Sequence, residues 1–167
     1  MRGQVRDEYV EYVTGRIAPL RRLAFLLCGD EHHADDIVQL TIEKLYRRWA
    51  RVSGMEHVDQ YVRQMLVRTF LDERRRPWAR VRLFDRAPEP APVPVDGESE
   101  TALAVRAALA RVPKRQQAVL VLRYLCDLPV DEVATILNCS PGTVKSQCSR
   151  GLAAMRRLVG DDLQRTV

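Results

Sequence analysis

Apolar residues recur at intervals of three and four along most of the chain, which is the period of an amphipathic α-helix. In the N-terminal part this pattern predicts three helices, over residues 7–30, 32–52 and 58–75. Pro19 is expected to kink the first of these or to split it in two, because proline removes a helical hydrogen bond. We find no convincing alternation of apolar and polar positions, so no strand is predicted. The predicted fold class is all-α.

Each predicted helix has one apolar stripe, which should face a core. The first stripe contains Tyr9, Val13, Ile17, Leu20, Leu23, Ala24 and Leu27. The second contains Ala34, Val38, Thr41, Leu45 and Trp49, and the third contains Val62, Met65, Leu66 and Thr69.

A change of composition divides the chain. Residues 77–100 hold five of its nine prolines and have no helical period, which is typical of an extended, semi-stiff linker. Helical periodicity resumes over residues 101–160, with breaks near Pro113, Asp127 and Asn138 that give four helices. We therefore predict a helical domain at 1–76, a linker at 77–100, a second helical domain at 101–160 and a short tail at 161–167.

The last two predicted helices have the pattern of a helix-turn-helix. A short amphipathic segment at residues 130–137 is followed closely by Ser140, a good N-cap residue, and by Pro141, which suits the first helical position. The second helix buries one stripe and turns a small, polar and basic face outward, as a helix that enters the major groove of DNA does. A helical hairpin that serves only for packing is the alternative. The residues of the outward face and of the helix start are Pro141, Gly142, Thr143, Lys145, Ser146, Ser149 and Arg150.

The distribution of charge favours a polyanionic partner. The chain has 27 basic and 22 acidic residues, a net charge of +5 and a sequence pI near 9.3. Residues 1–80 carry +3, residues 81–100 carry −3 and residues 101–167 carry +5. Two basic domains thus flank an acidic linker.

Several other classes of protein are disfavoured. The chain has no apolar run of transmembrane length, and its N-terminus lacks the apolar core of a signal peptide, so we expect a cytoplasmic protein without membrane insertion. The four cysteines form no CxxC pair and are interpreted as reduced thiols. His32 and His33 point about 100° apart on a helix and have no third ligand at matching spacing, so we predict neither a metal site nor a cofactor.

Three stretches resemble a known family. These are CGDEHHADDIVQLTIEKLYRRW at 28–49, QYVRQMLVRTFLDERRR at 60–76 and RVPKRQQAVLVLRYLCDLPVDEVATILNCSPGTVKSQCSRGLAAMRRL at 111–158. They are similar to regions 2 and 4 of the extracytoplasmic-function (ECF, group 4) RNA polymerase sigma factors, and most of all to the SigE-like subgroup. The resemblance covers roughly residues 7–159.

The resemblance implies a sigma factor that binds core RNA polymerase, directs it to promoters and promotes DNA opening. Region 4 would read the −35 element of promoter DNA through the outward face of the second helix of the helix-turn-helix. Region 2 would hold the −10 element, with a base captured by the loop at 51–60. The backbone contacts to the −10 element would come from Arg63, Arg68, Arg74 and Arg75.

The resemblance also implies protein partners. The outward face of the second predicted helix would bind the clamp helices of the polymerase β′ subunit, and region 4 would meet the β flap. An anti-sigma factor is a further candidate partner, and the linker is expected to thread the active-site cleft. The residues of the β′-binding face are Asp36, Gln39, Leu40 and Glu43.

Two other functions remain open from the residues alone. A stand-alone helix-turn-helix repressor would use the same DNA-reading face, but it would need a dimer. A metal-dependent nuclease would rest on Asp35, Asp36, Glu43 and the histidines. These groups do not converge on one helical face, and no nucleophile accompanies a base, so no catalytic residue is predicted.

Overall fold

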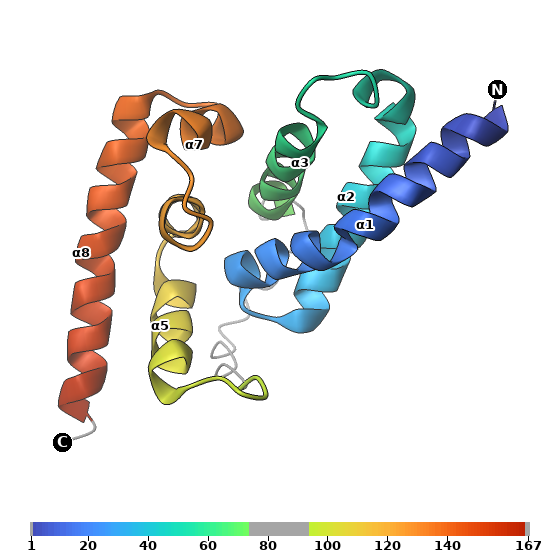
Figure 1. Cartoon of the computed structure of the whole chain (residues 1–167). Coiled ribbons are helices and arrows are strands. Elements are labelled where there is room, and N and C mark those ends of the chain that lie inside the picture. The colour runs from blue at the N-terminus through green and yellow to red at the C-terminus, as the bar shows by residue number, and fades with distance from the viewer. Residues whose placement is uncertain (1, 74–93, 166–167) are drawn as a thin grey trace. The chain divides into compact units, whose positions relative to one another are not determined.

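The computed structural model describes residues 2–73 and 94–165, and every regular element in these ranges is helical (Figure 1). The predicted all-α fold class is confirmed. The described residues form two compact units with a boundary after Asp72, each with its own core. Arg74, Arg75 and linker residues 77–93 lie outside the described residues.

Unit 1 contains three mutually packed helices, α1 (Arg2–Cys28), α2 (Glu31–Val52) and α3 (Val58–Asp72). Only Gly29 and Asp30 join α1 to α2. Gly29 has a positive φ of 71°, which glycine adopts without steric cost, and the Asp30 side chain accepts a hydrogen bond from the His33 N–H at 2.7 Å. The two residues that the sequence assigns to this break therefore end one helix and start the next.

The apolar stripes pack as the periodicity predicts, with two differences in α1. Ile17 is 39% exposed, because it lies at the edge of the stripe, about 60° round the helix from the buried Leu20. The predicted split at Pro19 is wrong, since α1 is one helix of 27 residues. Pro19 and Gly15 are both exposed, so water can reach the carbonyl that proline leaves without a helical donor.

A polar clamp ties α1 to the first turn of α3. Arg16 donates from Nε to Asp59 Oδ1 at 2.8 Å and from Nη2 to Oδ2 at 3.0 Å, and the Tyr12 hydroxyl donates to Oδ1 at 2.6 Å. The hydrogen bonds from Arg16 and then from Tyr12 lower the pKa of Asp59. Burial, followed by the bond to Asp59, raises the pKa of Tyr12. We call these three residues the Asp59 clamp.

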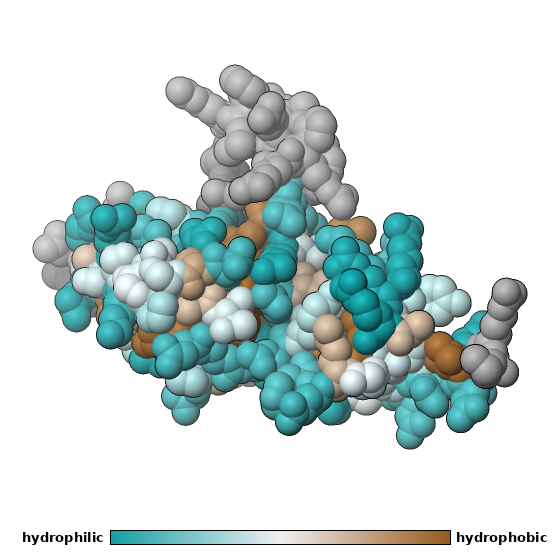
Figure 2. Space-filling model, turned by 90° about the horizontal axis from the view of Figure 1, so that it is seen from above, coloured by the Kyte–Doolittle hydropathy of each residue, from teal (hydrophilic) through white to brown (hydrophobic). Residues whose placement is uncertain are grey.

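Unit 2 contains α5 (Glu100–Arg111), α6 (Lys114–Leu120), η2 (Val121–Leu125), α7 (Val130–Leu137) and α8 (Pro141–Arg165). The long helix α8 packs against α5, α6 and α7. It continues to Arg165, so most of the segment predicted as a tail is helical. The surface seen in Figure 2 is mainly hydrophilic, as expected when the apolar stripes of both units are buried.

The short element η2 is a π-helical turn, which the sequence pattern does not reveal. The Cys126 N–H donates to the Val121 carbonyl, five residues earlier, at 2.9 Å. The wider turn keeps Val121 and Leu122 buried but leaves Tyr124 and Leu125 more than half exposed. Unit 2 thus presents two neighbouring apolar side chains on its surface.

We predict that Gly151→Ala destabilises unit 2. A Cβ at Gly151 would lie 3.0 Å from Leu120 Cδ1, and Leu120 is only 5% exposed and has little room to move. Overpacking costs about 1–3 kcal/mol, whereas alanine gains about 1 kcal/mol over glycine in a helix, so a net loss of about 1 kcal/mol is expected. Urea unfolding followed by circular dichroism measures it. Gly160→Ala, where a Cβ meets nothing within 4 Å, should stabilise α8 instead. Equal effects of the two substitutions would contradict this account.

We predict that the Asp59 clamp makes unit 1 sensitive to acid. The pKa of Asp59 is lower in the folded chain than in the unfolded chain. The contribution of Asp59 to the free energy of unfolding is therefore fully present above the ordinary aspartate pKa and is lost as the pH falls through the pKa of the folded state. Between about pH 7 and pH 3, Asp59→Asn should therefore lose less unfolding free energy than the parent chain. Asp36→Asn, at an exposed position of α2, serves as the control and should follow the parent. If the unfolding free energy of Asp59→Asn varied with pH as that of the parent does, the Asp59 clamp would not be the cause of the acid sensitivity.

Candidate nucleic-acid and polymerase interfaces

The turn between α7 and α8 is held by a left-handed residue and two hydrogen bonds. Asn138 adopts the left-handed conformation with φ 52°, which asparagine tolerates better than most residues. The Cys139 N–H donates to the Ala134 carbonyl at 3.0 Å, and Arg115 of α6 donates from Nη2 to the Leu137 carbonyl at 3.2 Å. The end of α7 is therefore fixed both by its own backbone and by a side chain from another helix.

The start of α8 is capped by Ser140. Its Oγ accepts from the Thr143 N–H at 3.1 Å and lies 2.9 Å from Thr143 Oγ1, and its carbonyl accepts from the Val144 N–H at 3.1 Å. Pro141 occupies the first helical position, as predicted. Among the described residues, apart from the chain neighbours and the backbone of α8, a Cβ added at Gly142 would meet Ser140 Oγ alone within 4 Å, at 3.8 Å. The helix start is therefore open to close approach.

The predicted DNA-facing residues of α8 lie mainly on its solvent side. Pro141, Gly142, Lys145, Ser146, Ser149 and Arg150 are exposed. Thr143 is half-buried, and its hydroxyl lies against Ser140, so it is less outward than the periodicity suggests. On the opposite side Val144 is fully buried and Gly151 is buried against Leu120. One face of α8 is thus fixed in the core while a basic and polar face meets water.

The predicted polymerase-binding residues share one face of α2. Asp36, Gln39 and Glu43 are exposed, and Leu40 is half-buried between them. Glu43 forms an ion pair with Arg47 one turn along the helix. Tyr46, which the sequence reasoning did not select, continues this face and is 56% exposed, with its ring edge packed on Tyr9. The face therefore combines charge, amide and apolar area.

The loop between α2 and α3 is short and exposed. All five of its residues, 53–57, are exposed, including Met55 at 40%. The Ser53 N–H donates to the Trp49 carbonyl at 2.8 Å, and the Met55 N–H donates to the Val52 carbonyl at 3.0 Å. The loop backbone is thus anchored to the end of α2, while its side chains face water.

Arginine and tyrosine side chains lie beside this loop, and sequence reasoning missed most of them. Arg48 donates from Nη1 to the Tyr61 hydroxyl at 3.3 Å. This bond is the main reason that the pKa of Tyr61 is lowered, and a further bond from Arg51 acts in the same direction. The segment RRWAR at 47–51, near the end of α2, was the available signal, because it places cations close to the end of a helix that precedes a predicted DNA-binding loop.

The structure does not bring the two described residues of the predicted −10 set together. Arg63 is half-buried, and its charge adds to the larger effect of the Arg16 and Tyr12 hydrogen bonds that lower the pKa of Asp59. Arg68 is exposed. Five residues apart on α3, they point about 140° away from each other and do not share a face. Arg74 and Arg75 lie outside the described residues. Of the described pair, Arg63 is the one next to the Asp59 clamp.

The described residues offer neither a candidate metal site nor a candidate membrane span. In the described ranges 2–73 and 94–165, no three His, Cys, Asp or Glu side chains form a group that could hold a metal ion. None of the described helices combines the length and apolar character needed to cross a membrane.

Comparisons with known proteins divide the chain in the same way. The family described as Sigma-70 region 2 matches residues 16–80, and the family described as Sigma-70, region 4 matches residues 102–155. The region 4 match ends within α8 and includes all of α7, the turn and the first four turns of α8.

Similar proteins carry related names. The RNA polymerase sigma-E factor of Streptomyces coelicolor is 36% identical over 163 residues, which cover 93% of this chain and 89% of that protein. The ECF RNA polymerase sigma factor SigM of Mycobacterium tuberculosis is 32% identical over 144 residues, covering 84% of this chain and 71% of that one.

Solved structures share the fold at lower identity. The sigma factor RpoE from Bartonella quintana, in complex with the anti-sigma factor NepR, has a TM-score of 0.75 at 21% identity and covers 92% of this chain and 97% of its own. CnrH, in complex with the cytosolic domain of CnrY, has a TM-score of 0.61 at 19% identity, covering 94% and 90%. With both sigma regions matched in order and relatives above 30% identity along most of their length, the chain belongs to the ECF group of the sigma-70 family and is similar to the sigma-E factors.

Proposed function

We propose that this chain is an alternative sigma factor that binds core RNA polymerase, directs it to promoters through their −35 and −10 elements and promotes DNA opening. The observation that carries the proposal is the presence of both sigma regions on one chain, each matched to its own compact helical unit. A stand-alone repressor has no use for the region 2 unit, so the rival function is disfavoured. We assign the chain no catalytic step, cofactor or metal.

Unit 2 is proposed to read the −35 element with the exposed face of α8. Arg150 can form paired hydrogen bonds to a guanine edge, while Lys145 is a point charge suited to a phosphate. Because Ser140 accepts from the Thr143 and Val144 amides, the Gly142 amide is the first-turn donor that remains for a phosphate at the helix start. We assign Thr143 a capping role and leave Ser146 and Ser149 as additional polar contacts.

Unit 1 is proposed to hold the −10 element beside loop 53–57. The exposed loop would receive a base from the non-template strand, and Arg63, Arg68, Arg74 and Arg75 would attract its backbone. We add Arg48 and Tyr61, because a cation next to an aromatic ring suits a single strand whose bases stack. The Asp59 clamp holds the first turn of α3, and therefore the end of the loop, in place.

Core polymerase is proposed to bind both units. The face of α2 with Asp36, Gln39, Leu40 and Glu43 would meet the β′ clamp helices, because a half-buried leucine among polar groups suits a helical partner. The exposed Tyr124 and Leu125 of η2 are our candidates for the β flap, since π-turns often mark functional positions.

The remaining parts of the proposal follow from the role of a sigma factor. The protein would act in the cytoplasm, where the promoter DNA is. The domain limits proposed are 1–76 for region 2, 77–100 for the linker and 101–160 for region 4, with α8 extending to Arg165. The similar sigma factor RpoE was solved with the anti-sigma factor NepR, which supports an anti-sigma factor as a candidate partner of this chain as well.

We predict that Leu40→Arg combined with Glu43→Arg abolishes sigma activity by preventing polymerase binding. The assay is run-off transcription from genomic fragments with core polymerase of the host, with start sites mapped, together with pull-down of core enzyme. The parent chain should give defined starts, and the double variant should give none and should not bind core, because it places two cations on the proposed contact face. Its circular dichroism should match the parent.

The control for that variant is Val10→Arg with Glu11→Arg, the same chemical change at exposed positions of α1. It should keep both activities. Core binding by the folded Leu40 and Glu43 variant would refute the assigned face, and the absence of any defined start with the parent chain would refute the function.

We predict that Arg150→Ala and Lys145→Ala weaken promoter use in different ways. Loss of a paired base contact should reduce discrimination at one −35 position by about 1–3 kcal/mol. Loss of a phosphate contact should lower the salt slope of binding by about 0.9 on every sequence. Binding of the polymerase holoenzyme to −35 variants over a range of salt concentrations separates the two effects. If both variants kept the −35 sequence preference and the salt slope of the parent, the assignment of α8 as the −35-reading helix would be contradicted.

A further inference from the structure

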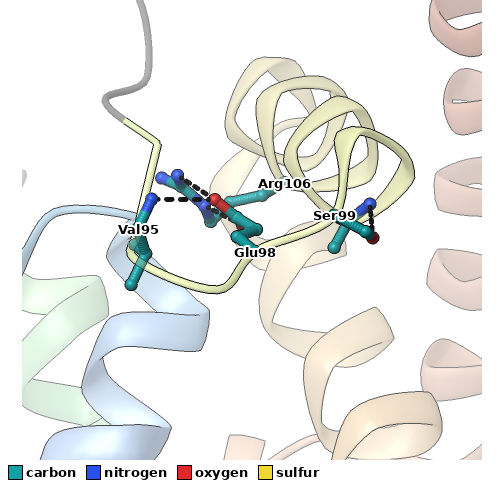
Figure 3. A network of polar contacts seen from close by, with 5 residues as sticks. Val95, Glu98, Ser99 and Arg106 are labelled. Carbon is teal, nitrogen blue, oxygen red and sulfur yellow. Dashed lines mark hydrogen bonds and ion pairs between the residues drawn. The ribbon is translucent and has the colours of Figure 1, made fainter.

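The residues just before α5 are folded back onto that helix by one carboxylate (Figure 3). Glu98 accepts hydrogen bonds from Arg106 at both oxygens, from Nε to Oε1 at 2.9 Å and from Nη2 to Oε2 at 2.9 Å. Its Oε2 also accepts from the Val95 N–H at 3.1 Å, and its own N–H donates to the Val95 carbonyl at 2.9 Å. We call this arrangement the linker clip.

The linker clip is shielded from water and geometrically specific. The side chains of Arg106 and Glu98 are 11% and 12% exposed, whereas those of the Arg16 and Asp59 pair are 45% and 55% exposed. A paired guanidinium and carboxylate contact fixes orientation as well as distance. Gly97 has a φ of 80°, as the third residue of a type II turn requires, so the backbone is shaped for the clip.

Helix α5 does not need the clip in order to begin. Ser99 already caps it, because its Oγ accepts from the Ala102 N–H at 3.1 Å and its carbonyl accepts from the Leu103 N–H at 3.0 Å. The added bonds to Val95 therefore hold the chain that precedes the helix. The sequence pattern assigns these residues to the linker, but their contacts join them to unit 2.

We propose that the linker clip sets the working length of the tether between the two DNA-binding units, and that Glu98 and Arg106 thereby determine the spacing between −35 and −10 elements that this sigma factor accepts. This inference rests on the proposed function. Glu98 and Arg106 act as positioning residues, since neither lies on the proposed DNA-binding surfaces or on the polymerase-binding surfaces of α2 and η2.

The effect on reach follows from chain geometry. With the clip closed, residues 74–94 connect Glu73 to Val95, and 21 residues span at most about 75 Å. With the clip open, the next fixed point is the Ser99 cap, which adds residues 95–98 and at most about 14 Å. At about 3.4 Å per base pair, this extra reach corresponds to about four base pairs of DNA. Opening the clip should therefore extend tolerance toward longer spacers.

The test compares four full-length variants with the parent chain, each with core polymerase on one mapped promoter. The promoter spacer is lengthened or shortened by one to four base pairs. Glu98→Gln keeps the shape of the side chain and removes its charge, and Arg106→Met keeps the apolar stem. Glu100→Gln is the charge-matched control, two residues away in the first turn of α5. The fourth chain is the parent with Gly-Ser-Gly-Ser inserted between Pro94 and Val95, which lengthens the tether without opening the clip.

We expect Glu98→Gln, Arg106→Met and the insertion to raise transcription from the longer spacers, relative to the best spacer, by at least about threefold. The parent and Glu100→Gln should keep a narrow optimum. Amide hydrogen exchange should be slow at Val95 and Glu98 in the parent, in Glu100→Gln and in the insertion chain, and fast in the two clip variants. An insertion that reproduces the clip variants shows that length, and not loss of stability, is the cause.

Three results would overturn the proposal. Fast exchange at Val95 and Glu98 in the parent would show that the clip is not closed in solution. Spacer preferences that stay parental in the clip variants would show that the clip does not set the tether, although the sigma function would stand. If the clip variants changed the spacer preference but the insertion did not, the change would be due to altered folding of unit 2 and not to tether length. If the parent transcribed no spacer variant, the proposed function would fail, and the exchange data would still decide whether the clip exists.

Discussion

Helix α8 rests on α6 at Gly151, and the presentation of the proposed DNA-reading face depends on this contact. Leu120 occupies the space that a side chain at position 151 would need, so the two helices come close at this point. Val144, about two turns earlier, is fully buried on the same side. Because Val144 and Gly151 fix one face of α8 in the core, the helix cannot rotate about its axis. Arg150 is therefore held outward, although it is the direct neighbour of the buried Gly151. The specificity of a helix-turn-helix is in this sense a consequence of packing.

The parts of the fold that sequence could predict are those encoded locally. The helical period gave the all-α class and most core positions, and residues such as Asp30 and Ser140 marked helix starts because a cap acts within one turn. The face of α2 and the outward face of α8 follow from the same period. Thr143 shows the limit of that reasoning, since a capping hydroxyl turns it partly inward.

The parts that sequence could not predict depend on contacts between distant residues or on departures from the regular period. Arg115 stabilises the end of α7 from 22 residues away, and the Asp59 clamp joins positions 43 residues apart. The π-turn at η2 inserts one residue into the helical register, so a pattern of period 3.6 cannot place Tyr124 and Leu125 on the surface. Arg63 and Arg68, which the family resemblance assigns to one promoter element, point about 140° apart on α3.

Charge alone does not identify the interface residues of this chain, because several charged groups have structural partners. Arg16 and Arg106 each hold a carboxylate with two hydrogen bonds, and Arg115 caps a helix, so these arginines are engaged within the fold. Lys145 and Arg150 are exposed on a face whose opposite side is buried, which leaves them available to a phosphate or a base. The same distinction applies to the acidic linker: Glu98 contributes to its net charge in the sequence, yet its carboxylate is shielded by Arg106 and Val95. The charge that a polymerase channel would meet is therefore smaller than the composition of residues 81–100 suggests, and the tether that must span two promoter elements is shorter than its proline-rich sequence suggests.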